Sequence, residues 1–123
     1  MSEFFLVRDD GFHADDGAEP VVLASDAEVE DLVGLLGLDL VAIDFPSMTD
    51  GRGFSLARRL RELGYQGRLR AVGKLIADQY AMARRVGFDE VRIPADLARR
   101  QPEEQWLFRA DWQDFDHRAR LAG

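Results

Sequence analysis

Apolar residues along the chain alternate between short runs and stretches with helical spacing. Short runs rich in Val, Ile and Leu predict β-strands. Four such runs lie at 20–24, 40–45, 68–72 and 91–93. Between them, apolar residues recur every three or four positions, which predicts amphipathic helices. These helices are expected over 25–36, 54–63 and 75–86, the first of them capped by Ser25 or Asp26.

Each predicted helix ends in a glycine that is followed by an apolar residue and then by a strand. The three pairs are Gly37-Leu38, Gly64-Tyr65 and Gly87-Phe88. A glycine at this position readily adopts the left-handed conformation that ends a helix, and the apolar residue packs back on the last turn. The glycines are 27 and 23 residues apart, which is about the length of one βα unit. The repeat predicts successive βα units.

Alternating strands and helices are typical of parallel strands joined by right-handed crossovers. The run 40–45 is nearly all apolar, as in a strand that is covered on both faces. We therefore expect an α/β fold: a single small domain, 1–123, of about four βα units with a mainly parallel sheet. The same pattern fits a Rossmann-like layer and a half-barrel, so both alternatives stay open.

The two ends of the chain differ from this repeat. Residues 1–19 are acidic, and 8–19 combine glycine with polar residues, which predicts a loop or mobile segment. Residues 95–100 lie between two prolines and predict a short helix. The tail 102–123 is rich in aromatic residues, and its stretch 105–115 is expected to add an edge strand or a docking segment.

Composition limits the classes of protein that this sequence represents. With 123 residues, of which 46% are hydrophobic, the chain is expected to form one globular domain. It has no cysteine, which excludes disulfides, thiolate catalysis and iron–sulfur clusters held by its own thiolates. His13 and His117 have no recognisable ligand or triad spacing, so no metal site is expected. No apolar stretch suits a signal peptide or a bilayer span, so we expect a cytoplasmic protein without membrane contact.

The net charge of −7 hides an uneven distribution. Residues 52–100 hold 12 of the 16 basic residues and 5 of the 23 acidic ones, which gives this segment +7 and the rest of the chain −14. Such asymmetry indicates where an anionic ligand or partner would bind. The alternative is a solvated, charged helix face between acidic ends.

Aromatic residues gather in the tail, where a nucleic-acid-binding surface would use them to stack on bases. They are Trp106, Phe108, Trp112 and Phe115. The tail is also acidic and would repel nucleic acid. We therefore expect these side chains to close the core or to contact another protein, and we expect no nucleic-acid partner.

Ligands of open α/β sheets and of barrels bind at the carboxyl ends of the parallel strands. The loop after 40–45 is the most informative of these ends, because its two glycines allow a close backbone approach and the following helix N-terminus favours anions. Arg52 and Ser55 would add a guanidinium group and a hydroxyl, and Lys74 a further cation. The candidate anion-binding or active cleft comprises Asp44, Asp50, Gly51, Arg52, Gly53, Ser55, Arg70, Gly73, Lys74, Asp78 and Gln79.

These residues also have a structural interpretation. The loop lacks the G-x-G-x-x-G fingerprint and the G-x-x-x-x-G-K-[ST] loop, so a sharp turn with Asp50 as helix cap and an exposed Arg52 is the alternative. Lys74, the only lysine of the chain, would then be solvated. Asp44 lies at the end of an apolar strand and needs a partner, which Arg52, Arg70 or Lys74 would supply.

The segment 43–89 carries a specific set of short motifs: DFP, TDGRGFSLARRLR, LRAVG, the DQ pair and RRVGFD. In order and spacing, these motifs closely resemble the bacterial domain of unknown function 934 family. The resemblance implies a proteobacterial cytoplasmic protein, of a kind described as an oxidoreductase involved in sulfite reduction because its genes lie beside sulfite reductase. Lys74 stands where an aspartate is common in the family, and Val86 where a cysteine is common.

Sulfite reduction needs an electron-carrying cofactor, and the sequence contains no motif for one. We therefore expect no cofactor in this chain and a redox centre in a partner. The first functional hypothesis is an accessory protein of sulfite reduction that binds a small anion (sulfite, sulfate or a phosphate-like ion) or contacts sulfite reductase. The alternatives are a small α/β enzyme acting on an anionic metabolite, and a homodimeric structural module.

Overall fold

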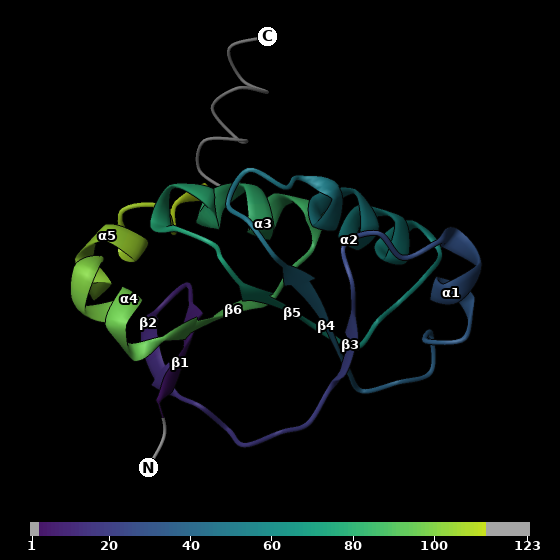
Figure 1. The fold of residues 1–123 in the computed structure, drawn as a ribbon, viewed down its shortest axis with the longest axis horizontal. Helices are drawn as coiled ribbons and strands as arrows, with labels where there is room; N and C mark the ends of the chain where they lie inside the picture. Colours follow the sequence, from purple (N-terminus) through teal and green to yellow (C-terminus); the bar gives the residue numbers. More distant parts are fainter. Residues whose placement is uncertain (1–2, 113–123) are drawn as a thin grey trace, which may run out of the picture.

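A computed structural model describes residues 3–112 and contains a twisted six-stranded sheet with helices on one face (Figure 1). The order of the strands in the sheet is β2-β1-β6-β5-β4-β3. The strands are β1 (Phe4–Arg8), β2 (Gly11–Ala14), β3 (Val21–Leu23), β4 (Leu40–Phe45), β5 (Arg68–Gly73) and β6 (Glu90–Pro94). The helices are α1 (Val29–Val33), α2 (Arg52–Glu62), the 3-10 turn η1 (Ala77–Gln79), α3 (Tyr80–Val86), α4 (Ala95–Arg100) and α5 (Glu103–Leu107).

The four strands β3 to β6 are parallel and lie side by side in chain order. Each right-handed crossover then returns its helix to the same side of the sheet, and α1, α2 and α3 all lie above it in Figure 1. The α/β prediction with a mainly parallel sheet is confirmed. A Rossmann-like layer would carry helices on both faces, so the consecutive order corresponds to the half-barrel alternative, left open at its edge strands β2 and β3.

The N-terminal segment is where the sequence interpretation fails. Residues 8–19 were expected to form a loop, but 11–14 form β2, which pairs antiparallel with β1, and β1 pairs antiparallel with β6. The hairpin is ordered because its inner face is apolar: the rings of Phe5 and Phe12 stack with centroids 5.7 Å apart. Charged residues at the turn and on the other face hide this alternation in the sequence.

Two predicted helices begin later than expected. The first begins at Val29 instead of 25 or 26, because Asp31 accepts a hydrogen bond from the Glu28 backbone N–H at 3.0 Å and so fixes the helix start there. The third was expected from 75, but α3 begins at Tyr80 after η1. There the Gln79 side chain accepts the Ile76 backbone N–H at 3.0 Å, which holds a tighter turn before the helix.

The glycine-and-apolar helix end is confirmed at two of its three predicted positions. Gly64 and Gly87 have φ of 100° and 116°, in the left-handed region. The next residue donates its backbone N–H across the last turn, from Tyr65 to Leu60 at 3.0 Å and from Phe88 to Ala83 at 3.0 Å. Gly37 has no positive φ, because α1 has already ended at Gly34.

In the described part of the tail, α5 is followed by a turn over 108–111, so no strand forms over 105–112. The indole of Trp106 is 1% exposed, donates its Nε1–H to the Gln101 carbonyl at 2.9 Å and packs edge-on against Tyr80. The prediction for Phe115, His117 and the end of the tail lies outside the described residues. No helix within 3–112 is long and apolar enough to cross a membrane.

The two faces of the sheet carry different residues. Val41, Ile43 and Phe45 of β4 face the helices and belong to the apolar core. Alternate positions therefore point to the opposite face, where the paired residues Arg70 and Glu90 lie side by side on β5 and β6. We call this the open face, because in Figure 1 the helices α1, α2 and α3 lie on the other side of the sheet and the connection from β2 to β3 runs along this one.

Candidate functional site

Asp50 organises the loop between β4 and α2. Its carboxylate accepts the Ser25 hydroxyl at 2.9 Å and the Arg52 guanidinium at 3.0 and 2.8 Å, and it also accepts the Arg52 backbone N–H at 3.1 Å. The hydrogen bonds from Arg52, followed by that from Ser25, hold the pKa of Asp50 well below its usual range. A carboxylate of such low basicity is a poor general base near neutral pH. Its geometry suits a fixed ion pair that positions Arg52.

A surface pocket of about 600 Å³ lies beside this ion pair, between α1 and α2. Arg52, Ser55 and Arg59 line one side of it, and Asp26 and Glu28 line the other. The loop after β4 and the start of α2 are thus part of a real concavity at the carboxyl end of the sheet. Its charge is mixed, so an anion would meet two carboxylates as well as two arginines.

The two loop glycines have different roles. Gly51 lies just before α2 and has open space at the position of a side chain. Gly53 faces the ring of Phe45, where a Cβ would come within 2.5 Å of Cζ. The absent side chain at 53 therefore lets α2 pack closely on β4, which is a packing requirement instead of a ligand contact.

We expect Gly53→Ala to lower the free energy of unfolding by about 1–3 kcal/mol, the usual cost of overpacking a core. Gly51→Ala is the matched control, because its φ of −86° suits alanine and nothing lies within 4 Å of the added methyl. Its expected effect is within about 0.5 kcal/mol. Urea denaturation of the two variants measures the difference, and equal stabilities would contradict the packing role of Gly53.

The ends of β4 and β5 place three more candidates at one edge. Phe45 pairs with Gly73, and the Lys74 backbone N–H donates to the Phe45 carbonyl at 2.8 Å. Gly73 has φ of 106°, and a Cβ there would meet the Phe45 carbonyl and the Asp44 carboxylate. Lys74 is exposed. Within 3–112, no ion pair joins Asp44 to Arg52, Arg70 or Lys74, the three partners expected for it.

Asp78 and Gln79 connect separate segments. The Gln79 amide donates to the Met48 carbonyl at 2.7 Å, which ties η1 to the loop after β4. Asp78 accepts a hydrogen bond from Arg109 at 2.9 Å, which ties η1 to the end of α5. Both side chains therefore hold neighbouring elements together at the carboxyl end of the sheet.

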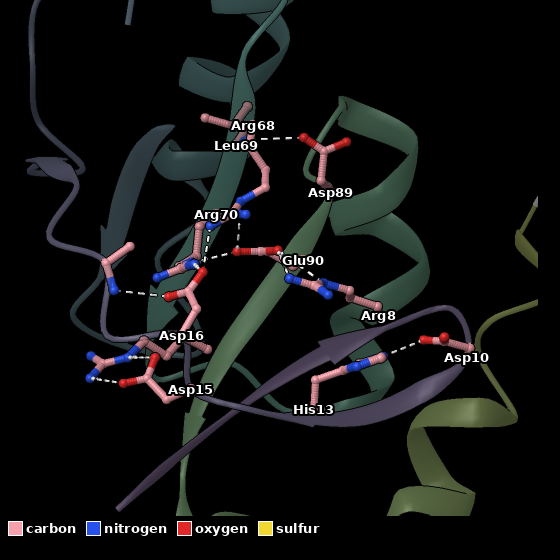
Figure 2. Close-up of polar contacts among 12 residues, drawn as sticks. Arg8, Asp10, His13, Asp15, Asp16, Arg68, Leu69, Arg70, Asp89 and Glu90 are labelled. Carbon is pink, nitrogen blue, oxygen red and sulfur yellow. Dashed lines mark hydrogen bonds and ion pairs between the residues drawn. The ribbon is translucent and has the colours of Figure 1, made fainter. Parts of the chain in front are cut away.

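Arg70 lies apart from the other candidates, in the middle of the open face. It is 1% exposed and forms ion pairs with Glu90 at 2.5 Å and Asp16 at 2.8 Å (Figure 2). The predicted residues thus fall into three groups. The first group surrounds the Asp50–Arg52 ion pair. The second comprises the candidates at the ends of β4 and β5 and those of η1. The third is Arg70 alone, on the open face.

Apart from Arg70, the residues of this charged network on the open face were not among the predicted site residues. Arg8, Arg68, Glu90 and Arg92 come from three neighbouring strands, and Asp15 and Asp16 reach them from the β2–β3 connection. A signal was present, because Arg68 and Arg70, and likewise Glu90 and Arg92, are two residues apart within predicted strands and must share a face. The partners Asp15 and Asp16 lie about 50 residues or more away in sequence, and no local pattern reveals them.

A second pocket, of about 690 Å³, opens at the amino ends of β5 and β6. It is lined by several arginines, but their guanidinium groups are held by the protein itself. Arg61 donates to the carbonyls of Gly87, Tyr65 and Gly67, and Arg84 donates to Asp9. The arginines of this pocket therefore hold neighbouring loops together through hydrogen bonds within the protein.

The outer side of the helices carries exposed apolar side chains between arginines. Phe108 is 73% exposed and Met82 is 46% exposed. Met82 contributes to two adjoining grooves of about 260 and 420 Å³. We call this the helical surface; its residues are Met82, Phe108, Arg58, Arg59, Arg85 and Arg109, and the carboxylates Glu62, Asp78 and Asp111 line the same grooves. Such a combination is suited to contact with another protein.

Neither metal ligation nor a known relative adds a further assignment. No three His, Asp or Glu side chains of the described chain are grouped as metal ligands would be. A family model described as a bacterial protein of unknown function (DUF934) matches residues 20–118. No curated protein and no solved structure matches the chain. The matched segment includes the loop after β4, the helical surface and all the arginines of β5 and β6, and it begins after Asp15 and Asp16.

Proposed function

Because the chain belongs to the DUF934 family of bacterial proteins of unknown function, we propose that it is a non-catalytic accessory protein of sulfite reduction. It docks on an acidic surface of sulfite reductase through the helical surface. The link to sulfite reduction rests on the motif resemblance of 43–89. The docking role is carried by one observation, the exposed pair Met82 and Phe108 among arginines.

The chemistry of the helical surface supports a protein partner. Phe, Met and Arg are the residue types enriched where proteins meet, and they supply most of the binding energy when they fill pockets on a partner. Two grooves adjoin Met82, so a partner side chain has a place to insert on either side. An exposed phenylalanine at 73% costs solubility, which favours a role that covers it.

Charge selects the kind of partner. The helical surface lies within the segment 52–100 that carries +7, apart from Phe108 and Arg109. Arg59 has only a loose ion pair with Glu62, at 3.7 Å, and both side chains are about half exposed. A partner with an acidic rim would therefore associate faster and more tightly at low ionic strength.

Two observations support a role without catalysis in this chain. There is no cysteine to form a redox-active thiol. The best-placed carboxylate of the predicted cleft, Asp50, is held by Arg52 as a weak base. Electron transfer and sulfur chemistry would then belong to the partner.

The docking proposal predicts that Phe108→Ala weakens binding to sulfite reductase by about tenfold or more, as expected for truncation of an interface anchor. Binding of the purified proteins, measured by surface plasmon resonance at two salt concentrations, tests it. Val33→Ala is the control, because Val33 is also exposed, at 58%, but lies on α1 away from the helical surface.

Several results would contradict the docking proposal. One is the absence of any association together with normal sulfite reduction in a deletion strain. Another is equal binding by the Phe108→Ala and Val33→Ala variants. A third is a dimer by light scattering that dissociates on Phe108→Ala, because the helical surface would then join two copies of this chain.

A second candidate function is the binding of a small anion, or action on an anionic metabolite, in the pocket between α1 and α2. It is favoured by the guanidinium of Arg52, which Asp50 fixes beside Ser55 at the start of an 11-residue helix. Arg52→Gln distinguishes the two functions. It removes the fixed cation of the pocket and leaves Met82 and Phe108 unchanged.

A further inference from the structure

Three arginines on two neighbouring strands of the open face are covered by a short acidic segment. Arg68 and Arg70 come from β5 and Arg92 from β6, and we call them the arginine cluster. The covering segment, residues 15–20 between β2 and β3, is called the strap. Figure 2 shows Asp15 and Asp16 of the strap turned toward the strands, with the carboxylate of Asp16 beside Arg70.

Asp16 lies between two members of the arginine cluster, Arg68 and Arg70. One of its oxygens, Oδ2, accepts hydrogen bonds from Arg68 at 2.6 Å and from Arg70 at 2.8 Å. A single acceptor between two guanidinium groups is the arrangement in which arginines bind an oxyanion. Asp15 contacts Arg92 more loosely, at 3.3 and 3.4 Å.

Among the described residues, the hydrogen bonds that join the strap to the open face come from Asp15 and Asp16. None of its residues belongs to the apolar core or packs against it. Residues 16–19 are exposed, and the remaining bond of Asp16 is local, from the Ala18 backbone N–H at 3.0 Å. A segment without apolar anchors is displaced at low cost when its ion pairs are replaced by equivalent ones.

Displacement of the strap would leave the open face strongly positive. Glu90 would remain as the one carboxylate in contact with Arg8, Arg68 and Arg70, and Arg92 would lose its partner Asp15. Arg70, now 1% exposed, would become accessible. Uncompensated guanidinium groups on adjacent strands repel one another, so an incoming anion would relieve that repulsion.

The ionised form of Asp16 is strongly favoured in this position. Burial would raise the pKa of Asp16, but the Ala18 backbone N–H and the guanidinium groups of Arg70 and Arg68 outweigh it and hold the pKa at about 2. The cluster thus selects a charged oxygen ligand over a neutral one.

The arginines and the covering aspartates also differ in their relation to the family. The arginine cluster lies inside the matched segment 20–118, whereas Asp15 and Asp16 precede it. Glu90, which pairs with Arg68 and Arg70, also lies inside the matched segment.

We propose that the arginine cluster is a binding site for a small divalent oxyanion, which the strap occupies with its own carboxylates until such an ion displaces it. The two strap carboxylates carry the charge of one divalent oxyanion. A tetrahedral ion in place of the Asp16 carboxylate would accept from Arg68 and Arg70 and leave an oxygen for Arg92. This site lies on the opposite side of the sheet from the helical surface. The oxyanion proposal is therefore tested independently of the docking proposal.

The test uses inorganic sulfate as the probe and isothermal titration calorimetry, with sodium chloride at matched ionic strength as the reference. The double variant Asp15→Asn, Asp16→Asn frees the arginine cluster. A site that is mostly covered binds with an apparent dissociation constant raised by the inverse of its open fraction. We therefore expect the variant to bind sulfate at least about tenfold more tightly than the wild-type chain.

Two control variants separate the site from general charge effects. Glu30→Gln with Glu104→Gln removes the same number of negative charges at exposed positions away from the open face, and its sulfate affinity should equal that of the wild type. Adding Arg68→Gln to the strap variant should abolish the gain. A gain in the charge control, no gain in the strap variant, or a gain that survives Arg68→Gln would each overturn the proposal.

NMR relaxation of the wild-type chain gives an independent readout that needs no variant. Arg68 and Arg70 hold the Asp16 carboxylate while the strap is in place. The backbone heteronuclear NOE of residues 16–18 should fall in saturating sulfate relative to chloride, because displacement removes the contacts that hold this segment on the strands. Unchanged NOE values in saturating sulfate would show that the strap stays in place and would overturn the proposal.

Discussion

Replacing Glu90 by glutamine is expected to lower the free energy of unfolding by about 3–5 kcal/mol, the usual cost of removing one partner from a buried ion pair. Glu90 is fully buried and lies within 2.5 Å of the Arg70 guanidinium and 3.1 Å of Arg8. Glutamine keeps the shape of the side chain but not its charge. Arg70, itself buried, would then keep only Asp16 as a counterion.

Urea denaturation followed by circular dichroism measures this loss. The double variant Arg70→Met, Glu90→Leu is the informative control, because replacing both members of a buried pair by apolar residues is often close to neutral. Arg100→Gln, which breaks an exposed pair with Asp96, should change stability by less than about 0.5 kcal/mol. A loss from Glu90→Gln as small as that from Arg100→Gln would contradict the buried-pair interpretation.

Trp106→Ala is expected to cost about 3–5 kcal/mol, because it removes a large buried side chain and leaves a cavity between α5 and α3. The indole is 1% exposed, contacts the Tyr80 ring at a centroid distance of 6.2 Å and satisfies the Gln101 carbonyl. Its loss would leave that carbonyl without its donor. Trp106 is the buried residue of α5, while Glu103 ties the helix to the sheet by accepting the Phe12 backbone N–H at 2.7 Å.

Phe108→Ala is the matched control for Trp106→Ala, two residues along the same chain segment. Phe108 is exposed, so its truncation should change the free energy of unfolding by less than about 0.5 kcal/mol. Thermal and urea unfolding of both variants compare the two positions directly. Similar losses would contradict the division of the tail into one core residue and one surface residue.

The strands of the βα repeat could be predicted because their signals are local. The run 40–45 is observed as β4 with the same bounds, and Gly64 and Gly87 end their helices as their left-handed preference requires. The start of α1 was misplaced because several residues near it can cap a helix. The Ser25 hydroxyl instead donates to Asp50, 25 residues away, and the helix begins at Val29, where Asp31 accepts the Glu28 backbone N–H.

The open face could not be predicted because its interactions join distant parts of the chain. Asp16 and Arg70 are 54 residues apart in sequence, and only the placement of the N-terminal hairpin beside β6 brings them together. The candidate loop after β4 was found because its composition is local and distinctive. The ion pair between Asp50 and Arg52 in this loop was not predicted. The same two residues are equally consistent with Asp50 as a helix cap and Arg52 as a solvated side chain.

The position of β1 also determines the order in which the molecule can be completed as it leaves the ribosome. β1 pairs with β6, so that Leu6 lies opposite Arg92, 86 residues later. The parallel units from β3 to β6 can assemble in sequence as they are synthesised, each on its predecessor. The N-terminal hairpin must wait for β6, because a contact of such sequence separation forms late. β1 is therefore synthesised before the other strands but joins the sheet last. The arginine cluster is accordingly exposed until the strap docks on it.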